Sequence, residues 1–443
     1  MTASVQPVRR PVWVSAARPV LVCAVLALAG PLARADDAFE TPPEQSPTVL
    51  LPDLKVTGDN YHVVDPVLSD GLMHHYVVDS KYGKFDGYGK FAARVRIHEV
   101  EALNELAKTS DIEVFAGGAV TGVGNEIKTV GQVVKNPFKV VVGIPTGIGH
   151  MFQGYTAKGE ELADSAKRST SGSGSGSGAG SSASHAADAG ADAAKKYADH
   201  YLGVSAAERR WYEKLAVDPY TNNQTLKNAV SHAAKVDAAG NFGMRFVGLA
   251  GIPGIDIVQR SMDAIYHEDP AAIRKRNRET LATYGLTPDE IRHWQDTFVL
   301  SPTRQVLLME AAKSLDGVDG RGEIFRHAIG LTSDAEAQVY VQSVGLLTLA
   351  HRAAPLARIL PGVRLPTAAR ANGDVVVAGA FDALYWTLPV ADGEAQIRQL
   401  LPPDLTGARQ FWLAGEASER AQKELAARGW ELHHAAEPAP AAH

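Results

Sequence analysis

A run of glycine and serine near the middle of the chain sets the strongest limit on what these 443 residues can fold into: Ser169–Ser184 reads STSGSGSGSGAGSSAS. Neither residue brings enough apolar surface to offset the entropy lost on ordering, so this run cannot contribute to a hydrophobic core. Such a composition is typical of a flexible coil, which over this length spans about 22 Å on average. The sequence therefore predicts a linker over residues 167–192, with a folded region on each side.

The composition indicates an ordinary globular protein and excludes several specialised classes. Apolar residues make up 45% of the chain and charged residues 21%, which is enough apolar material for buried cores. The formal net charge is −6, whereas a dedicated nucleic-acid binder needs a basic surface, so no nucleic-acid partner is expected. A single cysteine excludes a disulfide scaffold and any multi-cysteine metal centre. We expect no cofactor and no metal site.

The N-terminus has the features of a cleavable secretory signal. Three arginines within residues 9–18 form a basic region ahead of an apolar run at residues 20–32, and Ala33-Arg34-Ala35 supplies the small residues that a signal peptidase admits. The 13 apolar residues are too few to cross a bilayer, which takes roughly 20. We therefore expect residues 1–35 to be removed, by general or twin-arginine export, with no integral membrane span after cleavage.

Export changes the charge and the compartment. Residues 1–35 hold four arginines and no acids, so the mature chain has 40 basic and 50 acidic residues, a formal charge of −10, and no cysteine. The expected location is the periplasm or the medium, or a peripheral place at the outer membrane.

The region before the linker predicts a leader and a small domain. Residues 36–48 are acidic and proline-rich and predict a flexible leader, and residues 49–166 predict a domain with a β-hairpin and Gly-rich helices. Residues 82–91 repeat the tetrapeptide YGKF on either side of Asp86-Gly87, a pair suited to a tight turn because both positions tolerate positive φ. We expect the hairpin to turn there, and a helix to follow from about residue 97 to residue 108.

The next segment, residues 112–155, combines a helical pattern with many glycines. Apolar residues recur at steps of three and four, while Gly117, Gly124 and Gly131 fall seven residues apart on one face. Each glycine costs a helix about 1 kcal/mol relative to alanine, and a glycine face permits close approach of a second helix or a bilayer. Two interpretations stay open: tight packing inside this domain, or a contact surface for a protein partner or a membrane.

Beyond the linker, residues 193–355 predict a helical domain. Its helix starts are marked by residues whose side chains can accept a hydrogen bond from the first turn, several of them directly before a proline. The expected caps are Ser205, Asp269, Thr287, Ser301 and either Thr332 or Ser333.

The last part of the chain predicts a small α/β layer over residues 356–434 and a disordered tail at residues 435–443. A turn signal at Asn372-Gly373 leads into a valine-rich strand, and residues 410–413 and 430–433 read as strands with a helix between them. The fold class expected for the whole chain is therefore α+β, mainly α.

No familiar catalytic motif occurs in the chain: phosphate-binding loop, dinucleotide fingerprint, Gly-x-Ser-x-Gly elbow and zinc-binding helix are all absent. The best metal candidate is His74-His75 with Asp79, but adjacent strand residues point to opposite faces, so the two histidines cannot share an ion without a bulge. Tyr82 and Tyr88, beside lysines, could stack on a sugar or aromatic ligand or form cross-strand pairs. The speculative ligand or partner surface comprises His74, His75, Asp79, Tyr82, Tyr88, Gly117, Gly124 and Gly131, and no catalytic residue is assigned.

Three blocks of the sequence resemble those of a group of uncharacterised exported bacterial proteins without assigned activity. They are residues 75–85 (HYVVDSKYGKF), residues 136–149 (NPFKVVVGIPTGIG) and residues 217–223 (VDPYTNN). The resemblance extends over much of the mature chain and implies a bacterial envelope context, with no activity to transfer.

These features predict an exported bacterial envelope protein with a non-enzymatic binding or scaffolding role, whose contact surface is the Gly-rich segment together with residues 140–152. The expected partner is an envelope protein or a membrane surface. Two alternatives stay open: a hydrolase whose site follows no known motif, and a membrane-active protein that uses residues 112–155. A cleft with convergent His and Asp or Glu side chains would favour the hydrolase, and lipid binding would favour the membrane-active protein.

Overall fold

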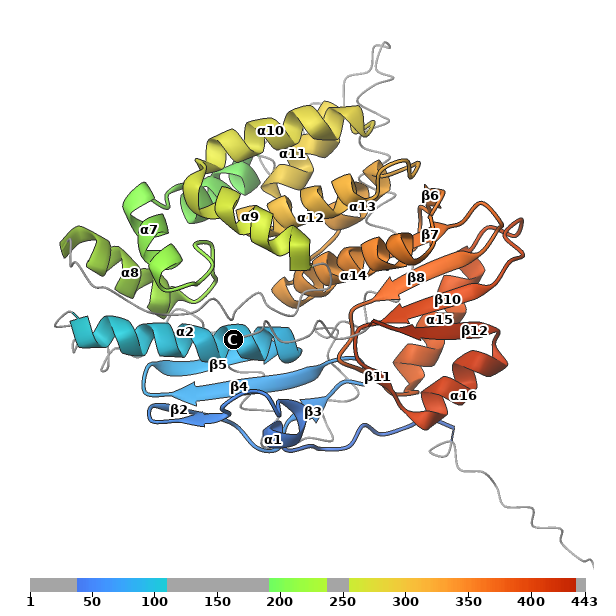
Figure 1. The fold of residues 1–443 in the computed structure, drawn as a ribbon, viewed down its shortest axis with the longest axis horizontal. Coiled ribbons are helices and arrows are strands. Elements are labelled where there is room, and N and C mark those ends of the chain that lie inside the picture. Colours follow the sequence, from blue (N-terminus) through green and yellow to red (C-terminus); the bar gives the residue numbers. More distant parts are fainter. Residues whose placement is uncertain (1–37, 110–190, 237–254, 436–443) are drawn as a thin grey trace, which may run out of the picture. The chain divides into compact units, whose positions relative to one another are not determined.

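The computed structural model describes residues 38–109, 191–236 and 255–435, of which those from Phe39 onward belong to one compact unit. The expected signal peptide, the Gly-rich segment, the Gly/Ser run and the chain after residue 435 lie outside these ranges. The described part mixes helices and small sheets and is mainly helical, which confirms the predicted fold class (Figure 1).

The first described region is an antiparallel sheet covered on one face by a long helix (Figure 1). Strand order is β1-β2-β4-β3, and β5 pairs with β4. Helix α2 packs across β4 and β5 because its side chains Ile97 and Val100 share one buried core with Tyr76 and Val78 of β4. The predicted helix is thus present and begins earlier than expected. The elements are α1 (Pro47–Leu50), β1 (Thr57–Gly58), β2 (Tyr61–Val63), β3 (Leu68–Ser69), β4 (His74–Ser80), β5 (Gly83–Tyr88) and α2 (Lys90–Thr109).

The hairpin exists, but the expected turn position is wrong. The chain turns between Ser80 and Gly83, and Asp86-Gly87 lies within β5, with Asp86 opposite Val77. Gly87 faces α2, where an added Cβ would lie 3.0 Å from backbone atoms of Ala92 and Ala93. The glycine therefore serves close approach of the helix, and the Asp-Gly pair does not serve a turn.

The leader expected at residues 36–48 is corrected over its described part, because its side chains make specific contacts. Glu40 accepts hydrogen bonds from the main-chain N–H of Trp386 and, at 2.6 Å, from the Ser418 hydroxyl. Gln45 forms a backbone bridge with Val67. Acidic and proline-rich composition concealed these contacts because their partners lie far along the chain.

The second region consists of helices whose starts are fixed by the predicted caps. Ser205, Thr287 and Ser333 each form a full capping box with a glutamate three residues on. Asp269 and Ser301 accept the expected backbone hydrogen bond ahead of a proline. The elements are η4 (Ala198–Leu202, a π-helical turn), α7 (Ala206–Lys214), α8 (Gln224–Val236), α9 (Ile255–His267), α10 (Pro270–Thr283), α11 (Pro288–Asp296), α12 (Pro302–Ser314), α13 (Gly322–Ile329) and α14 (Asp334–Ala353).

The third region is the predicted α/β layer, a five-stranded sheet in the order β12-β10-β8-β7-β6. Strands β8, β10 and β12 are parallel, and β7 and β8 form the hairpin expected at Asn372-Gly373, where Gly373 has a φ of +87°. Helix α15 was not expected, although Thr387 caps it and Pro389 lies in its first turn; Gly393 weakens its helical pattern. The elements are β6 (Arg358–Ile359), β7 (Thr367–Ala369), β8 (Val375–Gly379), β9 (Ala383–Leu384), α15 (Leu388–Leu400), β10 (Arg409–Leu413), β11 (Glu416–Ala417), α16 (Glu419–Ala427) and β12 (Trp430–His434).

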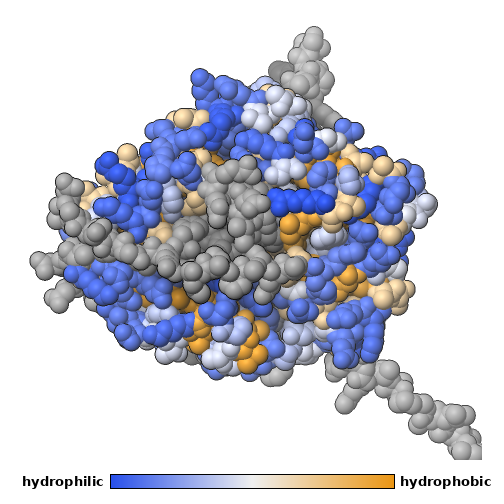
Figure 2. Space-filling model, viewed as in Figure 1, coloured by the Kyte–Doolittle hydropathy of each residue, from blue (hydrophilic) through white to orange (hydrophobic). Residues whose placement is uncertain are grey.

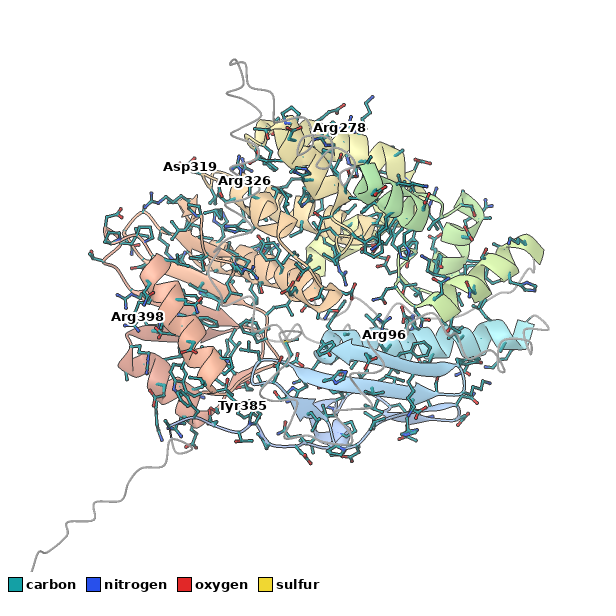
Figure 3. All side chains as sticks on the ribbon, turned by 180° about the vertical axis from the view of Figure 1, so that it is seen from behind. Arg96, Arg278, Asp319, Arg326, Tyr385 and Arg398 are labelled. Carbon is teal, nitrogen blue, oxygen red and sulfur yellow. The ribbon has the colours of Figure 1, made fainter. Side chains whose placement is uncertain are left out.

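Elements from the two sides of the Gly/Ser run pack against each other. Helix α2, which precedes the run, contacts α8, which follows it. The main-chain N–H of Tyr385 donates to the carbonyl oxygen of Gly71 at 2.9 Å, where the α/β layer meets the N-terminal sheet (Figure 3). Within the described residues, the regions before and after the run therefore form one body, while residues 167–190 of the predicted linker lie outside the described ranges.

Candidate functional site

The candidate residues on β4 do not converge, because the strand alternates as expected. His74 is buried at 2% exposure, while His75 lies on the opposite face, 2.9 Å from Asp86 Oδ1 and stacked on Tyr88 with ring centroids 4.5 Å apart. Asp79 forms an ion pair with Lys84 at 2.8 Å. On this face, His75, Asp79 and Tyr88 are thus engaged in cross-strand pairs.

The Tyr82 side chain is likewise engaged in contacts within the fold. Its hydroxyl donates to the carbonyl oxygen of Leu103 at 3.3 Å and lies 3.0 Å from Asn104 Oδ1, so it fastens the hairpin to α2. Gly117, Gly124 and Gly131 lie outside the described residues. Across the described ranges, no group of three or more His, Asp or Glu side chains is arranged to hold a metal ion.

His74 instead belongs to a buried polar junction that the sequence did not indicate. Its Nδ1 lies 3.5 Å from Asp382 Oδ2, and its Nε2 lies 3.2 Å from Gln45 Oε1. Asp382 follows β8 and also accepts hydrogen bonds from the main-chain N–H of Lys90, at 3.1 and 2.9 Å from its two oxygens. The junction therefore joins the segment of Gln45, the N-terminal sheet, the start of α2 and the α/β layer.

A second carboxylate, Asp70, lies beside the junction. Burial raises the pKa of Asp70, and hydrogen bonds from the main-chain N–H groups of Met73 and Leu72, at 2.8 and 2.9 Å, offset part of that effect. The negative charge of Asp382 raises the Asp70 pKa further. Two carboxylates and an imidazole are thus held together in a region of low polarity.

The His74–Asp382 pair has the residue types of a general base with its orienting acid, but each part has another partner. A hydrolase would need a nucleophile within hydrogen-bond reach of the imidazole. The outer imidazole nitrogen of His74 faces the Gln45 amide oxygen, and the Asp382 carboxylate is occupied by the first turn of α2. The arrangement therefore has a structural role, because it holds together segments that are remote in sequence.

A second buried polar network joins α2 to the loop between α7 and α8. Glu99 is 0% exposed, and its carboxylate accepts hydrogen bonds from Thr221 Oγ1, from Asn223 Nδ2 at 3.0 Å and from an Arg96 guanidinium nitrogen at 2.8 Å. Arg96 also donates to Asn222 Oδ1 and, at 2.9 Å, to the carbonyl oxygen of Asp86. We call these residues the Glu99 clamp: Arg96, Glu99, Thr221, Asn222 and Asn223.

The electrostatics of the clamp are balanced. Burial alone would lower the pKa of Arg96, but the adjacent Glu99 carboxylate outweighs that effect and raises it. Arg96 lies on the side of α2 that faces the helical region (Figure 3). Because the charge pair is hydrogen-bonded at almost every polar atom, it fixes the position of the loop relative to α2.

The same loop is held at a second point. His98 Nε2 lies 3.0 Å from the carbonyl oxygen of Leu215 and 3.1 Å from that of Ala216. Ala216 has a φ of +53°, a left-handed conformation that a residue with a Cβ rarely adopts. Such strain persists only where surrounding contacts enforce it, so the loop is a constrained part of the body.

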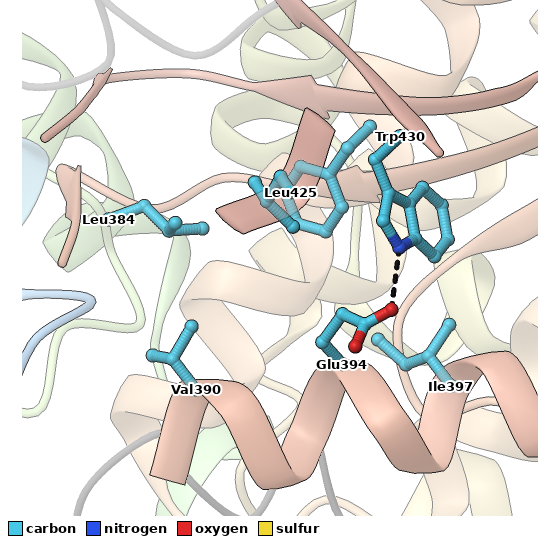
Figure 4. A pocket seen from close by; sticks show the side chains of 7 residues that line it. Leu384, Val390, Glu394, Ile397, Leu425 and Trp430 are labelled. Carbon is cyan, nitrogen blue, oxygen red and sulfur yellow. Dashed lines mark hydrogen bonds between the residues drawn. The ribbon is translucent and has the colours of Figure 1, made fainter. Parts of the chain in front are cut away.

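A small cavity lies in the α/β layer, between the sheet and helices α15 and α16 (Figure 4). Its volume is about 10 Å³, room for a single water, and apart from Glu394 its lining residues are apolar or aromatic. Glu394 points into this region, and its Oε1 accepts a hydrogen bond from Trp430 Nε1 at 2.8 Å and lies 3.1 Å from Arg398 Nε. The carboxylate is satisfied by these donors, and the space beside it is too small for a substrate.

The described surface carries only isolated apolar side chains. Val49, Leu388 and Leu400 are the large apolar residues that are exposed in the described ranges, at 68%, 52% and 41%. On the face shown in Figure 2, hydrophobic residues form separate patches among hydrophilic ones. Scattered apolar residues are normal on protein surfaces and do not mark a docking face.

Comparison with known proteins found no relative of this chain. No protein-family model matches the chain, and neither the curated proteins nor the solved structures contain a significant match. None of the helices in the described ranges is both long and apolar enough to cross a membrane.

Proposed function

We propose that this chain is an exported bacterial envelope protein with a non-enzymatic binding or scaffolding role, and that the Gly-rich segment, residues 112–155, forms its contact region. Its place is the periplasm, the medium or the periphery of the outer membrane, and its partner is an envelope protein. The alternative partner is a membrane surface. The experiment below distinguishes a protein partner from a membrane.

The observation that supports this proposal is the Glu99 clamp. Helix α2 ends at Thr109, just before the contact region, and the next described residues begin in a helix at Ala191, beyond the Gly/Ser run. The clamp joins α2 to residues 221–223, so one body supports both ends of residues 110–190. A segment attached at both ends to a fixed support loses less entropy on binding than a free chain does.

The chemistry of the region fits recognition better than catalysis. Gly117, Gly124 and Gly131 fall at intervals of seven, and glycines in such a pattern let a partner helix or a bilayer approach the backbone closely. The buried acid–base groups of the junction and of the Glu99 clamp, in contrast, are engaged in contacts within the body.

Two triple variants of the full exported chain test the proposal. In the first, Gly117, Gly124 and Gly131 are replaced by Leu, which fills the glycine face. In the control, Gly172, Gly174 and Gly176 of the Gly/Ser run are replaced by Leu, which adds the same apolar surface outside the contact region. Each chain is cross-linked in living cells and affinity-purified, and the captured envelope proteins are compared by mass spectrometry.

We expect the first variant to lose the partners that the wild type and the control retain, with unchanged thermal unfolding of the body. Equal capture by all three chains would refute the assignment of the contact region. Flotation of the mature wild-type chain with liposomes, without any captured protein, would support the membrane as the partner instead.

A further inference from the structure

Three basic side chains meet beside the π-helical turn η4. Lys227 Nζ lies 3.4 Å from His200 Nε2 and 3.4 Å from the carbonyl oxygen of His200. Lys196 Nζ lies 4.3 Å from the ring centroid of Phe298, and that ring lies 5.0 Å from the His200 ring. We call Lys196, His200, Lys227 and Phe298 the basic site.

The two lysines of the basic site contact no acidic side chain among the described residues. Within these ranges neither forms an ion pair with a carboxylate, although other lysines of the chain, such as Lys84 and Lys108, do. Glu208 and Asp218 act on Lys227 only as more distant charges. Among the described residues, no carboxylate therefore forms an ion pair with the positive charge at this point.

This arrangement is unfavourable for the protein alone. Burial lowers the pKa of His200 to about 4, and the charges of Lys227 and Lys196 contribute in the same direction. Burial also lowers the pKa of Lys227. Partly buried, unpaired positive charges of this kind occur mainly at functional sites, where a ligand supplies the missing negative charge.

The residues around the basic site are held in place by specific contacts. Lys196 and His200 are four residues apart, a spacing that places two side chains on the same side of a helix. The Tyr201 hydroxyl donates to the carbonyl oxygen of Phe298 at 3.0 Å, and the Tyr197 hydroxyl donates to that of Leu300 at 3.1 Å. These bonds fix the main chain that carries the Phe298 ring, and Lys196 and His200 both lie against that ring. π-Helical turns recur at functional sites.

We propose that the basic site binds a phosphate-type oxyanion, either as free phosphate or as the headgroup of an anionic lipid. Two ammonium groups offer several N–H donors to one oxyanion. The His200 imidazole adjoins the same ammonium group, because its Nε2 lies 3.4 Å from Lys227 Nζ. This site is independent of the contact region at residues 112–155, and either one can exist without the other.

Inorganic phosphate and vesicles distinguish the two sources. The mature full chain is titrated with phosphate by calorimetry and is floated with vesicles of phosphatidylcholine, with and without phosphatidylglycerol. The variants are Lys196→Gln and Lys227→Gln. The matched control is Lys195→Gln, which removes the same charge from the adjacent exposed residue, outside the basic site.

We expect Lys196→Gln and Lys227→Gln each to weaken binding about tenfold, while Lys195→Gln leaves it unchanged. If these changes are seen in the phosphate titration, the ligand is a free phosphate-type anion. If they are seen only in the flotation with phosphatidylglycerol vesicles, the ligand is a lipid headgroup. Lys227→Gln should also keep or raise the melting temperature, because it relieves repulsion, whereas a purely structural lysine would lower it. Absence of binding to both probes, or equal weakening by Lys195→Gln, would overturn the proposal.

Discussion

Asp382 accepts a hydrogen bond from the main-chain N–H of Lys90 at 2.9 Å, although the two residues are 292 positions apart. The carboxylate therefore caps the start of α2, which the preceding residue, Gly89, cannot do because it has no side chain. The same carboxylate lies 3.5 Å from His74. One side chain of the α/β layer thus fixes both the helix and the sheet of the N-terminal region.

Replacing Asp382 should destabilise the whole body. Asp382→Ala removes the cap and leaves buried polar groups unpaired, which is expected to cost about 2 kcal/mol of unfolding free energy. Asp382→Asn keeps an accepting oxygen and should cost less. Urea unfolding of both variants checks this, with Asp392→Ala on the exposed side of α15 as a control expected within about 0.5 kcal/mol of wild type. Equal midpoints for Asp382→Ala and the control would show that the cap contributes nothing.

Neutralising Glu99 should be more costly, because it leaves the partly buried Arg96 guanidinium without its counter-charge. Glu99→Gln is expected to lower the unfolding free energy by about 3 kcal/mol. The double variant Arg96→Gln/Glu99→Gln should recover part of the loss, so a double-mutant cycle measures the coupling. Glu419→Gln, in a pair whose carboxylate is 92% exposed, serves as control and should change little. Additive losses in the cycle would contradict a clamp held by this charge pair.

The role assigned to Gly87 predicts a contrast between two glycines. Gly87→Ala places a Cβ against the backbone of α2 and is expected to cost about 1–3 kcal/mol. Gly203→Ala, where the nearest heavy atom to the new Cβ is 3.9 Å away and φ is −80°, should be neutral or stabilising. Thermal unfolding of the two variants makes the comparison, and equal melting temperatures would place the approach of α2 to β5 in doubt.

Acid sensitivity should arise in part from His327. Burial and the adjacent Arg326 charge lower the pKa of His327 from 6.5 to about 4. Between these values the unfolded chain binds a proton that the folded chain does not, so stability falls as pH decreases from about 6.5 towards 4 and is fully retained above 6.5. His200 acts in the same direction.

The measurement is the unfolding free energy against pH in phosphate-free buffer, for wild type and His327→Gln. The variant should show a shallower decline over this interval, whatever its stability at neutral pH. Parallel curves would mean that His327 is protonated in the folded state as readily as in the unfolded chain.

Features that depend on neighbours in sequence were predictable. A serine followed three residues later by glutamate marks a helix start by itself, which is why the Ser205 cap is correct in position and in bonding. The strands that contain Val376 and Phe411 were likewise visible, because local apolar runs bounded by turn residues are typical of strands.

Features that depend on tertiary approach were not predictable. An Asp-Gly pair indicates a turn only if nothing else requires the glycine, and at Gly87 the requirement comes from α2. The pairings of Asp382 with Lys90 and of Glu99 with Thr221 cross 292 and 122 positions, and no local pattern encodes them. The same reason explains why the Gly/Ser run suggested two folded regions: composition reveals that a segment lacks a core of its own, but not whether its flanks meet.

Cleavage within the Gly/Ser run tests most directly whether one body supports both ends of residues 110–190. A recognition sequence for a specific protease, inserted between Gly176 and Ser177 of the mature chain, allows the run to be cut under native conditions. Size-exclusion chromatography with light scattering should then show both fragments eluting together at the mass of the uncut chain, and separating only in denaturant. Fragments that separate without denaturant at micromolar concentration would contradict a single body and, with it, the proposed display of the contact region.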